Sequence, residues 1–459
     1  MRSGLTCLLG LAGLALTNAS SLEKRDSLAV LAVPMVRDTS RQLSGRSMTL
    51  GVDLDNEDAR KISYVANVTF GTPPQHFLAY LHTWGNGCWL TSVDNHDCGL
   101  YVNRSLCGGY GGYNMTTSTT AKKLVEIFVY DDSGSMVGGD FVNDVLTIGG
   151  VTMDTMKMGI VTENSIIANT LSLGYGNASS TSLTQALVDA GTINSPAFSL
   201  WDQTALFGGV NKAKYDGPLY TFPIVNGSDL TKALRINMDD ISINMDGISV
   251  NETSATSKEF PLDAVFDTAV GMTYVPKSVA QALNAQIGNT SVPDHWGQVN
   301  FSCSAVGENS TINFKFGELD FLLYLSHFVS RERHTASQRW TSDEETCYFT
   351  ICENTNYQFE ASIVLGSNFI SKVYAVFDLG NDEISLAQRS WDYGPDDIPD
   401  DIVEITPGKD GVPGAKKDSG GTDKNGASEP KKNSAGMRIE KAMGMSALVV
   451  GTAVLIVIL

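Results

Sequence analysis

LHTWGNG at residues 81–87 and FDTAVG at residues 266–271 are two versions of one short pattern, about 185 residues apart. In each version, apolar residues lead into a polar residue, which is followed by a threonine and then by a run that contains glycine. The polar residue is His82 in the first version and Asp267 in the second. The functional interpretation of the sequence depends on this difference between the two versions.

The composition of the 459 residues limits the range of functions. Apolar residues make up 42% of the chain, which is enough for large cores, and the formal net charge is −19. So large an excess of acidic residues argues against nucleic acid or an anionic membrane surface as a partner. The sequence contains no paired C-x-x-C motifs, so we expect no metal, and no motif indicates a cofactor.

Residues 1–20 have the pattern of a secretory signal peptide. Met1-Arg2 precedes an apolar run at 5–16 that is too short to span a bilayer, and small residues follow it. Residues 21–56 form a polar, charged lead-in. The dibasic pair Lys24-Arg25 is a candidate processing site, and a cut there would leave a very short pro-segment.

The C-terminal residues predict a lipid anchor. Residues 434–459 resemble a glycosylphosphatidylinositol signal, with small residues, a polar spacer and a 14-residue apolar tail. Asn433 and Ser434 are the candidate attachment residues. A tail-anchored helix is the alternative, but it needs a longer apolar run. Residues 394–433 are acidic and then rich in Gly, Lys, Ser and Asp, so we expect a disordered polar stalk.

Glycosylation motifs and cysteines indicate the same compartment. Nine Asn-x-Ser/Thr motifs follow the signal, at Asn67, Asn103, Asn114, Asn177, Asn226, Asn251, Asn289, Asn300 and Asn309. Cys7 is removed with the signal, and the six remaining cysteines indicate disulfides, for which 15 connectivities are open on paper. These are Cys88, Cys98, Cys107, Cys303, Cys347 and Cys352.

The segment between the lead-in and the stalk has the pattern of β-strands. Alternating or β-branched runs occur at 64–70, 124–130 and 144–148, and Gly and Asn separate them. Only 182–190 and 276–286 have the starts and the periodicity of helices. An all-β protein is therefore expected.

Longer stretches of the sequence resemble the pepsin-like aspartic proteases. YVANVTFGTPPQHFLAYLHTWGNGCWL at 64–90 resembles the opening of that family, and LGYG at 173–176 resembles its glycine loop behind the first site. SLTQALVDAGTINSPAFSL at 182–200 resembles a helix and strand that follow. ALFGGVNKAKYDGPL at 205–219 resembles the segment that joins its two lobes, and IVLGSNFISKVYAVFDLGNDEISLAQ at 363–388 its closing segment.

This resemblance spans about residues 57–392. Together with the features of the two termini, the sequence resembles the anchored fungal members of the family, such as the yapsins. It implies an all-β bilobal fold, with lobes at 57–215 and 216–393 and a deep cleft between them.

The family's chemistry needs two carboxylates that share one proton and hold one water molecule. One carboxylate accepts a proton from the water while the other donates to the scissile carbonyl. The resemblance assigns Asp267 to one position and His82 to the other, and Thr83 and Thr268 to the threonines that brace the two loops. Tyr130 is the candidate flap tyrosine, on a hairpin that matches with one extra residue.

Several residues depart from the family's pattern. His82 replaces an aspartate, and the pairing of an imidazolium with the remaining carboxylate would oppose a shared proton. Trp84 stands at a glycine position, where an indole is expected to crowd the cleft. Gly85 replaces a serine, Ala269 a glycine and Val270 a hydroxyl residue, so catalysis is expected to be impaired.

Three functions are open on these grounds. The first is a catalytically impaired cell-surface endopeptidase homologue that binds an extended peptide or protein in the cleft. The second is an active His–Asp endopeptidase, because histo-aspartic members of the family have histidine at the position of His82 and cleave peptide bonds. The third is a structural cell-surface glycoprotein. We expect a monomer attached to the membrane by its lipid anchor, and no motif defines a substrate preference.

The resemblance also implies two disulfides. The family has a small loop bridge where Cys98 and Cys107 lie, and a bridge in its second lobe where Cys303 and Cys347 lie. Cys88 and Cys352 are then either buried thiols or a third link.

Overall fold

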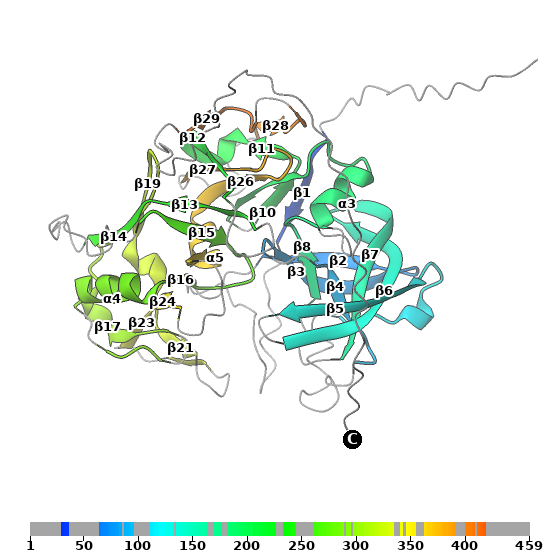
Figure 1. Ribbon diagram of the computed structural model, residues 1–459, viewed down its shortest axis with the longest axis horizontal. Helices are drawn as coiled ribbons and strands as arrows, with labels where there is room; N and C mark the ends of the chain where they lie inside the picture. Colours follow the sequence, from blue (N-terminus) through cyan, green and yellow to red (C-terminus); the bar gives the residue numbers. More distant parts are fainter. Residues whose placement is uncertain are drawn as a thin grey trace, which may run out of the picture. The chain divides into compact units, whose positions relative to one another are not determined.

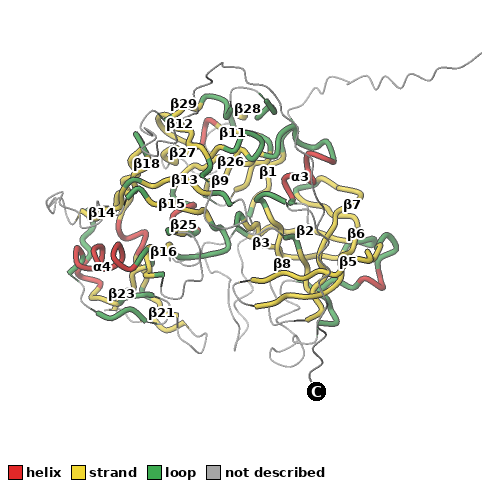
Figure 2. Tube along the Cα trace, viewed as in Figure 1, coloured by secondary structure: helices red, strands yellow, loops and turns green. Residues whose placement is uncertain are grey.

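The computed structural model consists mainly of strands with few helices, which confirms the all-β class (Figure 2). The structure describes residues 29–35, 64–84, 87–95, 111–132, 135–163, 169–176, 182–202, 204–225, 233–244, 260–288, 291–294, 297–334, 340–342, 346–354, 362–390, 400–408 and 411–418. Within these ranges, no helix is long and apolar enough to cross a membrane. The signal peptide, Lys24-Arg25, Asn433, Ser434 and the anchor signal lie outside the described residues.

The first half of the chain forms a seven-stranded sheet (Figure 1). Its order is β2 (Val65–Phe70), β3 (Gln75–His82), β8 (Asn169–Ser172), β4 (Trp89–Thr91), β7 (Val151–Glu163), β6 (Ser135–Ile148) and β5 (Lys122–Asp132). The short helices are η3 (Met115–Thr117) and α3 (Leu183–Asp189), and α3 lies at the helix predicted for 182–190. It begins there because the Ser182 side chain accepts a hydrogen bond from the Gln185 N–H.

The second half contains several smaller sheets. A five-stranded sheet has the order β13 (Arg235–Met238), β15 (Leu262–Phe266), β25 (Ile363–Leu365), β16 (Thr273–Val275) and β24 (Ile351–Glu353). One three-stranded sheet consists of β14 (Asp240–Asn244), β18 (Thr311–Phe316) and β19 (Leu319–Tyr324). Another consists of β17 (Asn300–Ser302), β23 (Thr346–Phe349) and β20 (Val329–Ser330). A two-stranded sheet pairs β21 (Glu332–His334) with β22 (Trp340–Ser342). The helices of the second half are η5 (Cys303–Ala305), η6 (Leu325–Phe328), α5 (Ser367–Ile370) and α4 (Lys277–Gln286), and α4 lies at the helix predicted for 276–286.

A further seven-stranded sheet takes strands from both halves and from both ends of the described chain. Its order is β1 (Leu31–Pro34), β10 (Thr204–Phe207), β9 (Ala197–Trp201), β26 (Val373–Asp378), β27 (Glu383–Arg389), β12 (Tyr215–Pro223) and β29 (Ala415–Lys417). One face belongs to the main core, where Phe198 stacks on Phe377 with ring centroids 4.8 Å apart. The other face carries a separate apolar cluster that includes Val376 and Leu219. The two halves are therefore joined by a continuous hydrogen-bonded sheet.

The lead-in contributes to this sheet, which the sequence analysis did not predict. Residues 21–56 were expected to be a polar lead-in, yet β1 within them pairs with β10 over Leu31–Pro34. Leu31 and Val33 are buried on the side that faces the core, while the alternating positions are exposed. Their period-two alternation is the physical reason that this segment forms an edge strand.

The stalk prediction for 394–433 is wrong over residues 400–408 and 411–418. There, β28 (Ile402–Glu404) pairs with β11 (Gly209–Asn211), next to η4 (Lys212–Lys214), and β29 pairs in parallel with β12 (Figure 1). Ile405 and Val412 are 0% and 3% exposed, because they cover the outer apolar face of the shared sheet. We call residues 400–408 and 411–418 the C-terminal strap. The polar composition of this stretch concealed the few apolar side chains that attach it.

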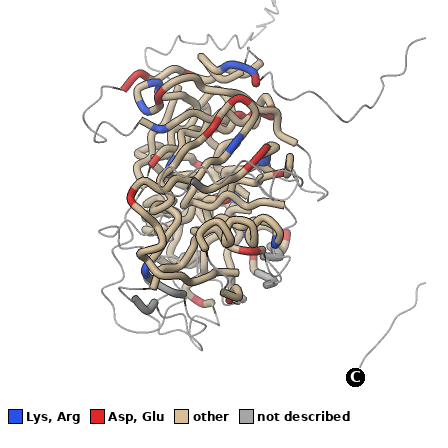
Figure 3. The backbone as a smooth tube through the Cα atoms, turned by 90° about the vertical axis from the view of Figure 1, so that its left-hand side faces the viewer, with Lys and Arg blue, Asp and Glu red and all other residues tan. Residues whose placement is uncertain are grey.

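Charged residues of both signs are interspersed along the described chain (Figure 3). Exposed ion pairs such as Lys123 with Asp140, at 2.7 Å, stabilise a fold by only about 0–1 kcal/mol each. The apolar clusters are therefore expected to supply most of the stability.

The second-lobe bridge implied by the resemblance is present, since Cys303 and Cys347 form a disulfide. Cys98 and Cys107 lie outside the described residues. Cys88 and Cys352 are buried thiols, one in each half of the chain. Burial raises the pKa of the Cys88 thiol to about 12, so this group is un-ionised and poorly reactive at physiological pH.

Replacement of Ile405 by alanine is expected to lower the free energy of unfolding by about 2–5 kcal/mol, because the fully buried side chain leaves a cavity. Ile127→Ala is the matched control: Ile127 is 74% exposed, and we expect a change below about 0.5 kcal/mol. Denaturant unfolding of both variants measures the difference. Equal, small changes would mean that the C-terminal strap does not stabilise the folded body.

Candidate active site

The two repeated loops follow equivalent strands in the two halves. β3 ends at His82 and pairs in parallel with β8, while β15 ends just before Asp267 and pairs in parallel with β25. The pairing continues beyond both strands: the Leu173 N–H donates to the His82 carbonyl at 2.8 Å, and the Asp267 N–H donates to the Leu365 carbonyl at 3.0 Å. Each titratable side chain thus stands at the carboxyl end of a buried strand.

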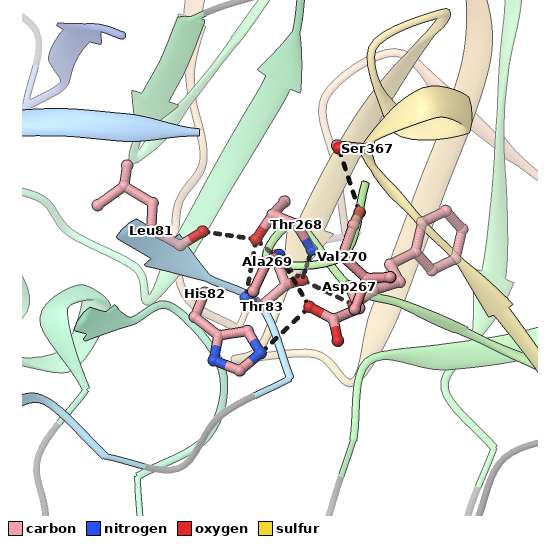
Figure 4. Close-up of polar contacts among 9 residues, drawn as sticks. Leu81, His82, Thr83, Asp267, Thr268, Ala269, Val270 and Ser367 are labelled. Carbon is pink, nitrogen blue, oxygen red and sulfur yellow. Dashed lines mark hydrogen bonds and ion pairs between the residues drawn. The ribbon is translucent and has the colours of Figure 1, made fainter. Parts of the chain in front are cut away.

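Thr83 and Thr268 hold the two loops together by reciprocal hydrogen bonds (Figure 4). The Thr83 hydroxyl donates to the Phe266 carbonyl at 2.7 Å and accepts from the Thr268 N–H at 3.0 Å. The Thr268 hydroxyl donates to the Leu81 carbonyl and accepts from the Thr83 N–H at 3.1 Å. Both threonines are 1% exposed, so this threonine brace replaces water for four buried backbone groups.

His82 and Asp267 face each other across the threonine brace (Figure 4). The distance between His82 Nε2 and Asp267 Oδ1 is 3.1 Å, and the two side chains are 15% and 4% exposed. The same Oδ1 accepts a hydrogen bond of 2.9 Å from the Ala269 N–H. Alanine at this position therefore leaves a backbone donor in place for the carboxylate. The pair can form an imidazolium–carboxylate contact, which is a charge-assisted hydrogen bond.

The loop after Asp267 is fastened to the segment that begins α5. The Ser367 N–H and hydroxyl both donate to the Val270 carbonyl, at 2.7 and 3.1 Å (Figure 4). Gly366 lies so close to the Met272 carbonyl that a Cβ atom there would overlap it. Val270, which stands where the family has a hydroxyl residue, thus keeps a backbone contact with Ser367. These bonds hold the second loop in place.

Trp84 packs across to the second half of the chain. Its half-buried side chain packs, as does that of Tyr274, against an apolar cluster formed by Ala233, Val265 and Val364. The indole was expected to crowd the cleft, and the structure shows a defined apolar surface against which it lies. Sequence reasoning missed this surface, because its members come from three separate segments.

A polar cluster beside the apolar one was also missed. Arg235 is 1% exposed, and its guanidinium pairs with Asp263 at 3.1 Å. The Ser362 hydroxyl and N–H donate to the other oxygen of Asp263. The sequence feature that could have revealed this polar cluster is the spacing of Asp263, Val265 and Asp267. Residues two apart on a strand point to the same face of the sheet.

The remaining predicted residues are only partly described. The backbone of Tyr130 lies in β5, opposite Val137, whereas its side chain and Gly85 lie outside the described residues. Among the motif asparagines that the structure describes, Asn67, Asn300 and Asn309 are exposed and Asn114 is half-buried. The others lie outside the described residues, at Asn103, Asn177, Asn226, Asn251 and Asn289.

The sequence is similar to those of known proteins. A family model for eukaryotic aspartyl protease matches residues 63–389. The chain is 28% identical over 441 residues to the probable aspartic-type endopeptidase opsB of Aspergillus oryzae, covering 90% of this chain and 86% of that protein. It is 26% identical over 368 residues to aspartic proteinase yapsin-3 of Saccharomyces cerevisiae, with coverages of 75% and 69%. For secreted aspartic protease 8 of Candida albicans the identity is 28% over 344 residues, with coverages of 72% and 76%. The chain belongs to the eukaryotic aspartyl protease family, and its fold is pepsin-like.

Thr268→Val is expected to lower the free energy of unfolding by about 1–3 kcal/mol for each buried group left unsatisfied. The isosteric change takes away the hydroxyl that bonds the Thr83 N–H and the Leu81 carbonyl. Thr147→Val is the control, since the Thr147 hydroxyl pairs with Thr152 at an exposed position. Denaturant unfolding compares the two variants, and a loss no larger than that of the control would contradict a stabilising role of the threonine brace.

Proposed function

We propose that this protein is a secreted, glycosylated and lipid-anchored homologue of the aspartic endopeptidases in which catalysis is impaired. The observation that carries the proposal is the 3.1 Å contact between His82 Nε2 and Asp267 Oδ1. In the family's reaction, two carboxylates sharing one proton let one group act as acid and the other as base. An imidazolium beside a carboxylate forms an ion pair, and no proton is then shared between two carboxyl oxygens.

An active His–Asp endopeptidase is the second candidate. The intact threonine brace and the support of the second loop favour it, because they keep both side chains in facing positions. A neutral imidazole can accept a proton from water, and a carboxylic acid can donate one to a carbonyl. This reaction would need a neutral His82 and a protonated Asp267, whereas the ion pair consists of a protonated His82 and an ionised Asp267.

A structural glycoprotein of the cell surface is the third candidate. The packing of Trp84 against the second half of the chain favours it, because an indole there occupies space beside Asp267. In that case the protein would cleave no peptide and would bind none at this position.

A location at the cell surface agrees with features from separate parts of the chain. The apolar residues near each terminus have the lengths of a signal peptide and an anchor signal, rather than those of spanning helices. Asn67, Asn300 and Asn309 are exposed, as acceptors of glycans must be. One relative carries the name secreted aspartic protease 8.

The purified ectodomain is expected to show no measurable endopeptidase activity on an unfolded protein substrate between acid and neutral pH. Loss of one member of a catalytic unit commonly costs about three or more orders of magnitude in turnover, because such residues act together. The assay includes a pepstatin-type inhibitor as a control. Wild-type turnover that disappears on Asp267→Asn would establish the His–Asp endopeptidase instead.

Reversion variants separate the causes of impairment within the same experiment. His82→Asp alone is expected to restore little activity, because Trp84 still packs beside the site. Addition of Trp84→Gly and Ala269→Gly is expected to restore more. Full activity from His82→Asp alone would show that the other departures have no effect on catalysis.

Phosphatidylinositol-specific phospholipase is expected to release the mature protein from membranes, because a glycosylphosphatidylinositol anchor replaces residues 434–459. Detection in the supernatant, with and without the enzyme, measures the release. Mass spectrometry of the membrane fraction is the control. Retention of the protein together with its C-terminal peptide would mean that the apolar tail itself anchors it.

A further inference from the structure

The C-terminal strap lies beyond the residues that the family model matches, which end at 389. Its two short strands attach it to the body, β28 beside β11 and β29 beside β12 (Figure 1). Between these strands, Ile405 and Val412 are buried in the outer apolar cluster. Among the residues that the structure describes, Val412 is the last in the chain with a buried side chain. The C-terminal strap therefore has an apolar part that ends at Val412 and a polar part that follows it.

The polar part, residues 415–418, is held mainly by backbone hydrogen bonds. β29 pairs in parallel with β12 over three residues, and the Asp418 N–H donates to the Thr221 carbonyl at 3.1 Å. The Asp418 carboxylate accepts a hydrogen bond of 3.0 Å from the Glu318 N–H, in the turn between β18 and β19. Ala415 is half-buried, and the other three side chains are polar. Few buried apolar contacts thus oppose a local opening of this part.

Gly414 separates the polar part from the apolar part. Its φ is +82°, a backbone conformation that favours glycine, and the space beside its Cα holds only side-chain atoms of Lys212 and Tyr215, at 3.7 and 4.0 Å. The backbone can therefore turn at Gly414 while Val412 stays in the apolar cluster. Residues 415–418 can leave β12 in this way without uncovering the outer apolar face of the shared sheet.

The polar part carries two adjacent cations, Lys416 and Lys417, and both are exposed. The Lys417 ammonium lies 3.6 Å from Glu383 Oε1, but the lysine side chain is 81% exposed, so this ion pair adds little stability. A segment that already has the extended backbone of a strand is in the conformation in which peptides pair with a second protein. The two ammonium groups are thus accessible to a protein that binds neighbouring cations.

We propose that the peptide bond between Lys417 and Asp418 is a cleavage site for an endopeptidase whose pockets place carboxylates against two adjacent cations. The oxygen of a water molecule bonds to the Lys417 carbonyl carbon as the C–N bond breaks, which leaves a carboxylate on Lys417 and an ammonium group on Asp418. The cut separates the body from the anchor but leaves Ile405 and Val412 in place. The proposal rests on the proposed secretion and anchoring, and it adds a route by which the folded body is released.

Two further dibasic pairs are less suited to such a cut. Lys122-Lys123 is also exposed, but it lies in the 11-residue β5, and Lys123 forms an ion pair of 2.7 Å with Asp140. Lys431-Lys432 directly precedes the candidate attachment residue Asn433. A bound peptidase contacts residues on both sides of the scissile bond, and after Lys432 these would carry the lipid. Lys416-Lys417 lies 16 residues before Asn433, outside this restriction.

The C-terminal residue of the released protein tests the proposal. The full chain is produced in a secreting eukaryotic host that cleaves a co-expressed reporter with a Lys-Lys pair in a flexible linker. Mass spectrometry of the chain in the medium is expected to find Lys417 as the last residue. Lys417→Gln is expected to lower the released amount about thirtyfold or more, because an acidic pocket is then left without its cation.

Two variants serve as controls. Lys417→Arg keeps the charge and is expected to keep the release, which separates recognition of the cation from the packing of the C-terminal strap. Lys123→Gln removes a lysine from the other exposed pair and is expected to change nothing. A released chain that ends beyond Lys417, at Lys432 for example, would overturn the proposal. So would equal release of Lys417→Gln, or no release from a host that cleaves the reporter.

Failure of the proposed anchoring gives a different result. A protein that is not anchored reaches the medium whatever stands at position 417, whereas phospholipase treatment alone distinguishes a lipid anchor from an apolar tail. A membrane form that the phospholipase releases, without any chain ending at Lys417, would contradict the cleavage and leave the anchoring intact. In each case the C-terminal residue of the chain in the medium decides whether the bond after Lys417 is cut.

Discussion

The reciprocal hydrogen bonds between Thr83 and Thr268 are the constraint on which the site depends. Each hydroxyl donates to a carbonyl of the opposite half and accepts an N–H from it. No water reaches these groups, because both side chains are buried, so separation of the loops would leave four backbone groups unsatisfied. None of these bonds involves the side chain at position 82 or 267. The hydrogen bonds that hold the two loops together therefore do not depend on which side chains stand at positions 82 and 267.

This independence explains how the chain accommodates histidine in place of a carboxylate. Asp267 is only 4% exposed, and a buried charge without a partner is strongly destabilising. His82 Nε2 lies 3.1 Å from the carboxylate and is a cationic partner when the imidazole is protonated, and the Ala269 N–H supplies a second donor. The replacement therefore leaves the remaining carboxylate with two polar contacts. An apolar residue at position 82 would lack this compensation.

The main elements of the fold and the two loops could be predicted from the sequence, because their signals are local. The alternating strands, the two helices with their starts and the repeated loops each occupy one continuous segment. The pairing of Cys303 with Cys347 followed from the resemblance to the family. The strand at 31–34 and the C-terminal strap were missed, because each is a short apolar run in a polar stretch. Their partners lie about 170–196 residues away, and no local pattern identifies such a partner.

The environment of Trp84 could not be predicted for a related reason. The sequence shows that a large side chain replaces a glycine, but the direction of that side chain depends on what the other half presents. Ala233, Val265 and Val364 form a surface only after three strands have paired. The same holds for the buried pair of Arg235 and Asp263, whose two residues are ordinary members of separate strands.

The shared sheet has a consequence for the synthesis of the protein. Its strands include β1 at residues 31–34 and β29 at residues 415–417, so about 385 residues separate the first from the last. At about 5–20 residues per second, a ribosome needs about 20–80 s to produce that length. Leu219 is synthesised about half-way through this interval, and from then on the outer apolar face lacks the cover that Ile405 and Val412 later supply. The nascent chain therefore cannot complete this sheet, or bury its outer apolar face, until the last strand has been synthesised.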